Sequence, residues 1–211
     1  PVRHRFACAA LPSDFQWLRP PFPERLFSLS ERPGWLRLHG RESIGSWFEQ
    51  SLVARRQEHF SFRAETTMDF SPVNIQQAAG LTLYYNRHKF HRLAVTPDAK
   101  RGRVLTILSC SGNWPDGKLE FPLGDPLPLP ASGTVDLAAE VDGAALQFFA
   151  DSGAGWRKIG PALDASVVSD EGGRGEHASF TGAFVGMVAF YVSGGALPAD
   201  FSRFDYLLRD A

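Results

Sequence analysis

Two pairs of carboxylate residues come near the spacing that glycoside hydrolysis requires. That reaction uses two carboxyl groups about 5 to 9.5 Å apart, and residues i and i+2 of a strand lie about 6.6 Å apart on one face. Glu140 and Asp142 have this spacing but run into a hairpin turn, where Asp suits the backbone conformation. Glu65 and Asp69, four residues apart on a strand, would be separated by about 13 Å. We therefore interpret Glu140 and Asp142 as structural residues of the turn, and Glu65 and Asp69 as members of solvated cross-strand pairs.

Metal and nucleophile chemistry have little support in the sequence. The histidines are scattered, and His88 and His91 lack a carboxylate or a third ligand close by, so we do not expect a zinc site. The one cation that we retain is calcium at Asp200, because β-sandwich domains often fix their loops with hard cations. A Gly-x-Ser-x-Gly turn and a Cys-His signature are both absent from the sequence. We predict that the chain needs no other cofactor.

Charge and hydropathy argue against several classes of partner. The 22 basic and 23 acidic residues give a formal net charge of -1, which offers no general attraction for nucleic acid or anionic lipid. The basic spots 55–56 and 87–89 are too small for a nucleic-acid track, so we interpret them as salt-bridged surface or as an interdomain contact. No apolar run approaches the ~20 residues of a membrane helix, and we recognise no signal peptide, so we expect a cytoplasmic location.

Aromatic residues are the remaining candidates for a binding function. Sugars present flat apolar faces that stack on such rings, so a carbohydrate platform is one interpretation of Trp47, Trp114, Trp156, Tyr84 and Tyr85. Packing in a core or an interface is the alternative, and we favour it for each residue taken singly.

The elements that would position these residues are strands. The chain has 17 Phe, 20 Gly and 15 Pro, a composition typical of many short strands joined by tight turns. Apolar residues alternate most regularly over residues 60–70, where Phe60, Phe62 and Phe70 share one face. Asp142-Gly143 is the strongest hairpin signal. About a dozen strands predict an all-β, two-sheet antiparallel sandwich of jelly-roll type, in one domain over 1–211.

The first 34 residues are rich in proline, and we expect them to form an extended lead-in packed on the sandwich. The first residue is Pro rather than Met, which suggests a piece of a longer protein. Cys8 and Cys110 are far apart in sequence and are predicted to be free, buried thiols.

The stretch 179–191 combines a strand pattern with a glycine-rich approach. Small residues alternate with large ones, which favours a strand packed closely on both faces. The long loop over 161–178 precedes it, and its glycines at 172, 173 and 175 would allow backbone conformations that other residues avoid. We predict that this loop holds Phe180 out at the rim of a sheet, which makes it the best functional candidate, while Phe184 to Phe190 remain in the core.

Several segments, in order along nearly the whole chain, resemble the C-terminal domain of family 43 β-xylosidases. They include the run from Arg32 to Ser43, Val53-Ala54-Arg55-Arg56-Gln57, Tyr84-Tyr85-Asn86 and Phe180-Thr181-Gly182-Ala183-Phe184. The resemblance implies a concanavalin-like β-sandwich that follows a five-bladed β-propeller. The propeller would carry the inverting catalytic carboxylates, so none is assigned here, and the family's aromatic at the active-site mouth falls on Phe180.

The resemblance implies an accessory domain that acts on xylo-oligosaccharides together with the propeller of the same polypeptide. Without that partner, an uncovered apolar surface would favour a homo-oligomer. A free-standing carbohydrate-binding module is the alternative, motivated by the tryptophans. An independently catalytic sandwich glycanase is disfavoured, because the pattern Glu-x-Asp-x-x-Glu would need a carboxylate where Ala145 stands.

Overall fold

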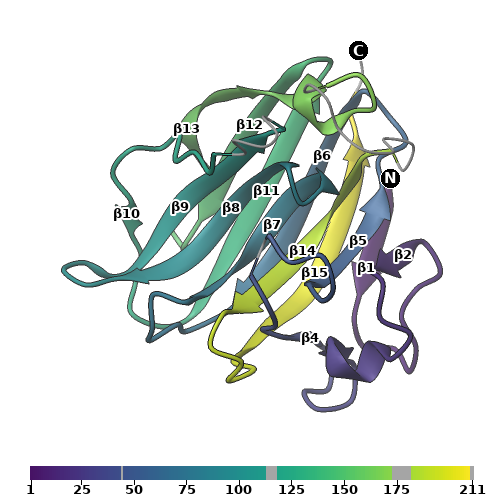
Figure 1. Cartoon of the computed structure of the whole chain (residues 1–211), viewed down its shortest axis with the longest axis vertical. Helices are drawn as coiled ribbons and strands as arrows, with labels where there is room; N and C mark the ends of the chain where they lie inside the picture. The colour runs from purple at the N-terminus through teal and green to yellow at the C-terminus, as the bar shows by residue number, and fades with distance from the viewer. Residues whose placement is uncertain (44, 113–117, 173–181, 210–211) are drawn as a thin grey trace.

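Two antiparallel sheets packed face to face form the computed structural model, which describes residues 1–43, 45–112, 118–172 and 182–209 (Figure 1). The first sheet has seven strands in the order β10-β9-β8-β7-β14-β5-β2. Its strands are β2 (Phe15–Trp17), β5 (Ser51–Arg56), β7 (Gln77–Asn86), β8 (Lys89–Asp98), β9 (Gly102–Ser111), β10 (Leu127–Pro128) and β14 (Phe184–Tyr191). The predicted sandwich is confirmed.

The second sheet has eight strands in the order β13-β12-β11-β6-β15-β4-β3, with β1 also paired to β15. Its strands are β1 (Val2–Arg5), β3 (Phe27–Ser28), β4 (Leu36–His39), β6 (Ser61–Asp69), β11 (Thr134–Asp142), β12 (Ala145–Asp151), β13 (Arg157–Asp164) and β15 (Pro198–Leu208). Two short 3-10 helices, η1 (Pro23–Arg25) and η2 (Ala165–Val168), complete the described elements. Neither is long and apolar enough to cross a membrane.

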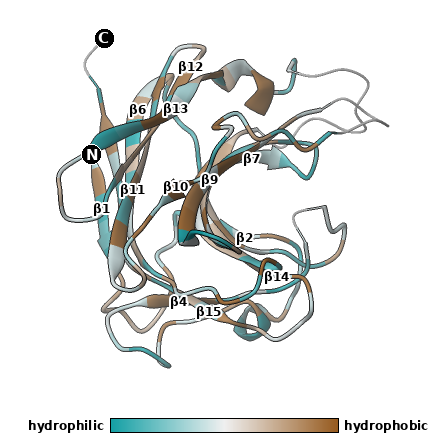
Figure 2. Cartoon of the chain, turned by 90° about the vertical axis from the view of Figure 1, so that its left-hand side faces the viewer, coloured by the Kyte–Doolittle hydropathy of each residue, from teal (hydrophilic) through white to brown (hydrophobic). Residues whose placement is uncertain are grey.

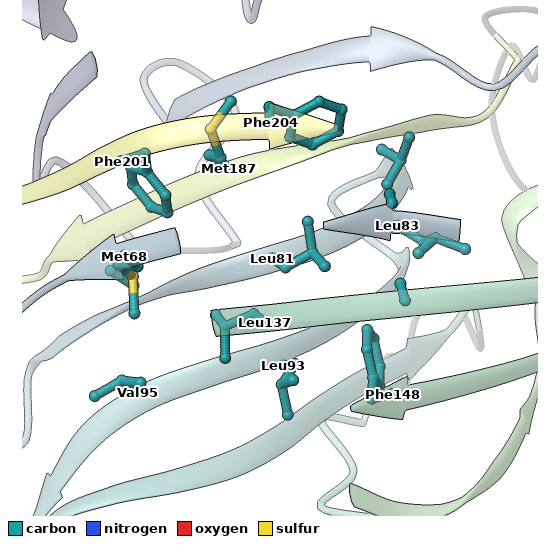
Figure 3. Close-up of a cluster of buried hydrophobic side chains, with 14 of the residues drawn as sticks. Met68, Leu81, Leu83, Leu93, Val95, Leu137, Phe148, Met187, Phe201 and Phe204 are labelled. Atoms are coloured by element: carbon teal, nitrogen blue, oxygen red, sulfur yellow. The ribbon is translucent and has the colours of Figure 1, made fainter. Parts of the chain in front are cut away.

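The core lies between the two sheets and follows from the alternation of side chains along each strand. Met68, Leu137 and Phe201 come from the eight-stranded sheet, and Leu81 and Leu93 come from the seven-stranded sheet (Figure 3). All five are fully buried, which is the state that alternating apolar positions favour. Brown, hydrophobic residues along β7 and β9 mark the seven-stranded sheet in Figure 2.

Three local predictions need correction. Phe60 precedes β6 and is 83% exposed, so the buried alternation begins at Phe62. The hairpin turn consists of Gly143 and Ala144 instead of Asp142-Gly143, with Gly143 at φ 57°. The predicted long loop from residue 161 is shorter, because β13 continues to Asp164 and η2 follows it.

The outward faces of the two sheets differ in character. The outer face of the seven-stranded sheet carries a second apolar cluster, which includes Tyr84, Phe90 and Val188. The segment 45–50, which we call the flap, contacts this face through Gln50, whose side-chain oxygen accepts a hydrogen bond from Arg92. The outer face of the eight-stranded sheet carries ion pairs instead. The sandwich therefore has one charged and one apolar outer face.

One end of the sandwich brings together several connections and the beginning of the chain. Val2 is in register with Tyr206, near the end of β15. The link from β5 to β6 and the β7–β8 hairpin lie at the same end, since Phe184 pairs with both Arg56 and Tyr84. We call this the proximal end. The links from β6 to β7 and from β8 to β9 lie at the distal end.

Candidate functional site

Phe180, the predicted substrate-binding residue, lies outside the described residues, but both flanks of its segment are placed at the proximal end. On one flank, the Tyr85 hydroxyl donates a hydrogen bond to Asp170. The backbone N–H of Gly172 donates to Ser169 Oγ at 2.9 Å. On the other flank, the Ala183 carbonyl accepts from the Gln57 N–H at 2.9 Å. The described residues on both sides of this segment therefore lie beside the ends of β5 and β7.

Gly182 has a conformation and surroundings that suit only glycine. Its φ is +74°, in the left-handed region that other residues rarely adopt. A Cβ at this position would lie 2.5 Å from Nη1 of Arg56. The Arg56 guanidinium in turn lies 4.9 Å from the centre of the Phe184 ring. The arginine side chain thus packs tightly over the residues that lead into β14.

Strand β14 holds these residues in place because it lies inside the seven-stranded sheet, between β7 and β5. Val185 and Met187 point into the core, whereas Val188 points into the outer cluster. Gly186 allows the neighbouring strand to approach, since a Cβ there would lie 2.3 Å from the Val53 carbonyl oxygen. Alternating small and large residues therefore correspond to close packing on both faces.

The two basic spots of the sequence both lie at the proximal end. Arg87 stacks on Trp47 of the flap, with its guanidinium 3.5 Å from the ring centre, and donates to the Gly45 carbonyl at 2.6 Å. Arg56 is exposed, whereas Arg55 is buried and pairs with Asp14 and Glu58. One arginine of the spot 55–56 is thus structural, and the other faces outward.

A buried arginine below the flap was missed by sequence reasoning. Arg92 is fully buried on the outer face of β8, and burial lowers the pKa of its guanidinium to about 10. Its Nε donates to Thr82 Oγ1 at 3.3 Å and its Nη2 to Gln50 Oε1 at 3.4 Å. Burial also raises the pKa of the adjacent Tyr84, against the lowering effect of Arg92, Arg19 and Arg87. The only sequence signal was a basic residue at an outward-facing strand position.

The carboxylates that we tested for acid–base chemistry are held in ion pairs or hydrogen bonds. Glu140 pairs with Arg63 at 2.6 Å, and Asp142 accepts from the Ser61 hydroxyl at 2.8 Å. Glu65 also pairs with Arg63, at 2.5 Å. Glu140 and Asp142 sit on the outer side of the eight-stranded sheet, where they stabilise cross-strand neighbours.

Asp200, the one position considered for calcium, is instead the acceptor of two arginines. Its carboxylate accepts hydrogen bonds from Arg37 at 2.7 Å and from Arg32 at 2.7 Å. Burial raises the pKa of this carboxyl, but the hydrogen bonds from the two arginines outweigh it and keep the pKa below its usual value. Two positive charges leave this site unsuited to a cation. No cluster of metal-ligating side chains occurs within the described part of the chain.

The histidines and cysteines considered above lie in unrelated environments. His91 is buried, and its ring nitrogens form hydrogen bonds with Ser109 Oγ at 2.8 Å and with the Asp164 carbonyl at 2.9 Å. His88 packs edge-on against Trp47, with 5.9 Å between the ring centres. Cys110 is buried as predicted, whereas Cys8 is only half-buried, and the two cysteines form no disulfide.

The aromatic residues proposed as a sugar platform do not come together. Tyr85 lies in the core between the sheets, and Tyr84 lies in the outer cluster. Trp156 stacks with Arg63 of β6, in the eight-stranded sheet, at 4.5 Å, whereas Trp47 belongs to the flap. Trp114 lies outside the described residues. Among the aromatics that the structure places, the platform interpretation was therefore wrong.

Comparison with known proteins places this architecture in a defined family. Residues 3–207 match the family model described as the β-xylosidase C-terminal concanavalin A-like domain. A xylosidase/arabinosidase 43B of Humicola insolens is 51% identical over 94% of this chain, which corresponds to 37% of that protein. A putative β-xylosidase of Escherichia coli is 41% identical over 97% of this chain and 38% of that protein.

A solved structure agrees with these sequence matches. The xylan β-1,4-xylosidase of Bacillus halodurans superposes with a TM-score of 0.92 at 35% identity, covering 98% of this chain and 39% of that one. The chain thus spans less than two fifths of the length of these relatives. It belongs to the family of C-terminal concanavalin A-like domains found in family 43 β-xylosidases.

Proposed function

We propose that this chain is the non-catalytic C-terminal domain of an inverting family 43 β-xylosidase. It packs on a catalytic β-propeller of the same polypeptide and supplies Phe180 to the active-site mouth, where xylo-oligosaccharides are hydrolysed. The observation that carries the proposal is the family match over residues 3–207. In the relatives, the matching part makes up only 37% to 39% of the protein's length. The ion pairing of Glu65 and Glu140 agrees with placing the catalytic carboxylates elsewhere.

The flanks of the Phe180 segment support a positioning role. Asp170 and Gly182 are both placed at the proximal end, so the segment that contains Phe180 is attached to the sandwich on both sides. An aromatic ring held in this way can pack against a sugar face and keep water out of a pocket without transferring a proton. Phe180 would therefore act on substrate placement.

The test compares variants of the complete polypeptide in steady-state hydrolysis of xylobiose and an aryl xyloside. We expect Phe180→Ala to lower kcat/KM by about 10- to 100-fold, because roughly 1–3 kcal/mol of packing in the transition state is lost. Phe180→Tyr keeps the ring and should retain most of the activity. Phe121→Ala removes a ring that is 54% exposed elsewhere on the domain and serves as the matched control.

Two results would overturn the proposal. An unchanged kcat/KM in Phe180→Ala would show that this residue does not contribute to the active-site mouth. Hydrolysis of the aryl xyloside by residues 1–211 alone would contradict a non-catalytic role. Titration calorimetry with xylo-oligosaccharides tests the alternative of a free-standing carbohydrate-binding module. Binding by residues 1–211 that is lost in Trp47→Ala would favour that alternative.

A further inference from the structure

An exposed groove at the edge of the seven-stranded sheet is built from two segments that are distant in sequence. It has a volume of about 800 Å³, and it lies between the lead-in at Pro20 and Phe22 and the flap at Trp47 and Phe48. Phe22 is 55% exposed and Phe48 is 79% exposed. Clustered rings of this kind, accessible to solvent, are typical of a surface that is covered in the complete protein.

The groove is continuous with the proximal end, where the Phe180 segment is anchored. Arg19 in the lead-in donates to the Trp47 carbonyl, and Trp47 packs against Arg87 and His88 of the β7–β8 hairpin. Arg19 and Arg87 both lie close enough to Tyr84 to affect its pKa, and Tyr84 is in register with Phe184. The groove therefore leads to the start of β14.

The groove is held in a specific shape rather than left as a loose loop. Arg19 has φ 67°, a left-handed conformation that is unusual for a residue other than glycine. The Arg19 side chain binds the flap at the Trp47 carbonyl, and Glu49 ties the other side of the flap to Arg41 at 3.0 Å and to Arg25 at 3.3 Å. A preformed groove reduces the ordering cost of binding.

Charge also distinguishes this region. Arg19, Arg56 and Arg87 surround the end of the outer face. Both acidic residues that line the groove are already bound within the domain, Glu42 by the Ser46 hydroxyl and Glu49 by Arg41 and Arg25. Tryptophan and arginine are the residue types most often found at the energetic centres of protein interfaces. The surface thus fits a partner that presents both apolar and acidic side chains.

We propose that this groove, together with Arg56 and Arg87, is the docking surface for the catalytic part of the same polypeptide. The identity of the occupant rests on the function proposed above. The relatives carry more than three fifths of their length outside this domain, and the first strand, with Val2 beside Tyr206, starts from the proximal end. The charged outer face of the eight-stranded sheet, in contrast, satisfies its carboxylates internally.

The experiment uses the complete polypeptide with the double substitution Phe48→Ser and Arg56→Glu. Both side chains are exposed, so the fold of the domain should persist. The matched control is Ile75→Ser with Arg101→Glu, which changes an exposed apolar residue and an arginine at the distal end. Small-angle X-ray scattering and differential scanning calorimetry report on docking, and kcat/KM reports on its consequence.

We expect the test variant to show a larger radius of gyration and two separate unfolding transitions, while the control keeps the compact shape and a single transition. Its kcat/KM should fall about tenfold or more, because Phe180 would be withdrawn along with the domain. An unchanged radius of gyration and a single transition in the test variant would overturn the proposal. Conversion of a dimer into a monomer with an unchanged protomer shape would overturn it as well, because the groove would then be a contact between copies.

The two proposals fail in distinguishable ways. If the complete polypeptide does not hydrolyse xylosides, the proposed function is wrong, yet scattering and calorimetry still report whether the groove docks the rest of the chain. If Phe180→Ala lowers kcat/KM but the groove variant keeps its shape and activity, the function stands and the docking surface is wrong.

Discussion

Arg37 and Asp200 face each other in register on β4 and β15, and the arginine donates hydrogen bonds of 2.7 and 2.9 Å to the two carboxylate oxygens. Arg32 adds a third hydrogen bond at 2.7 Å and stacks on Trp35 at 4.0 Å. A carboxylate with two arginines on one side is a fixed structural element. It ties the lead-in to the middle of the eight-stranded sheet.

Replacing Asp200 with Asn should therefore lower the free energy of unfolding by about 2–4 kcal/mol, because two partly buried arginines lose the carboxylate that they share and keep only Asp69 and Glu31 as partners. Urea unfolding measures the change. Asp125→Asn, whose partner Arg101 is also exposed, is the control and should cost less than about 0.5 kcal/mol. Addition of EDTA or calcium should leave the wild-type midpoint unchanged. A calcium-dependent increase would restore the metal interpretation.

Replacing Gly186 with Ala should destabilise the domain by about 2–3 kcal/mol, since the added methyl overlaps the backbone of β5 and a backbone atom cannot rotate away. Gly80→Ala should behave similarly, because its Cβ would meet the Leu93 carbonyl oxygen. Gly45→Ala is the control, with Ser43 Oγ at 3.8 Å as its nearest neighbour. Thermal unfolding gives the comparison, and equal midpoints for all three variants would contradict the close approach of the strands.

Burial lowers the pKa of His91 from the ordinary value of 6.5. The unfolded chain therefore binds more protons than the folded one below that pH, and the free energy of unfolding should fall as pH decreases from 7 toward 5. His91→Gln should lose this part of the acid dependence, as measured by urea unfolding at pH 7.5 and 5.5. His39→Gln, a half-buried histidine beside Glu31, should keep it. Identical pH profiles for wild type and His91→Gln would count against the shift.

Replacing Arg92 tests how much a buried, unsatisfied hydrogen-bond donor costs in stability. Its Nη1 has no hydrogen-bond partner in the described part of the structure, and an unsatisfied buried donor costs about 1–3 kcal/mol. Arg92→Met fills a similar volume without that cost, so we expect a gain of about 1 kcal/mol in urea unfolding. Arg92→Lys, which keeps a buried charge with fewer donors, should be less stable than wild type. A marked loss of stability in Arg92→Met would mean that Nη1 is satisfied in solution.

The fold was largely accessible from the sequence because it rests on a local rule. Alternation over residues 60–70 predicts a strand, and Phe62 and Met68 lie in the core as this rule requires. The rule failed at Phe60, which extends the pattern but has no strand partner to cover it. The turn at Gly143 was displaced by one residue, since register depends on both strands of the hairpin.

The candidate site was less accessible, because it depends on contacts between distant segments. In the sequence, Arg87 belongs to a basic spot and Trp47 is an aromatic residue 40 positions earlier, and no local pattern links the two. In the structure, the flap places the Trp47 ring centre 3.5 Å from the Arg87 guanidinium. Asp200 looked like a free loop carboxylate, although its arginine partners lie 163 and 168 positions earlier in the chain. Pairings over such separations follow from topology rather than from local patterns.

The position of β15 has a consequence for synthesis. It is made after every other strand of the structure, yet it lies between β6 and β4 and contributes Phe201, Phe204 and Tyr206 to the core. Until β15 has been made, the eight-stranded sheet therefore stays split, with β6 and β4 lacking their common neighbour. The sandwich can close only once translation has passed Leu208, so none of the earlier strands can complete the fold without the last one.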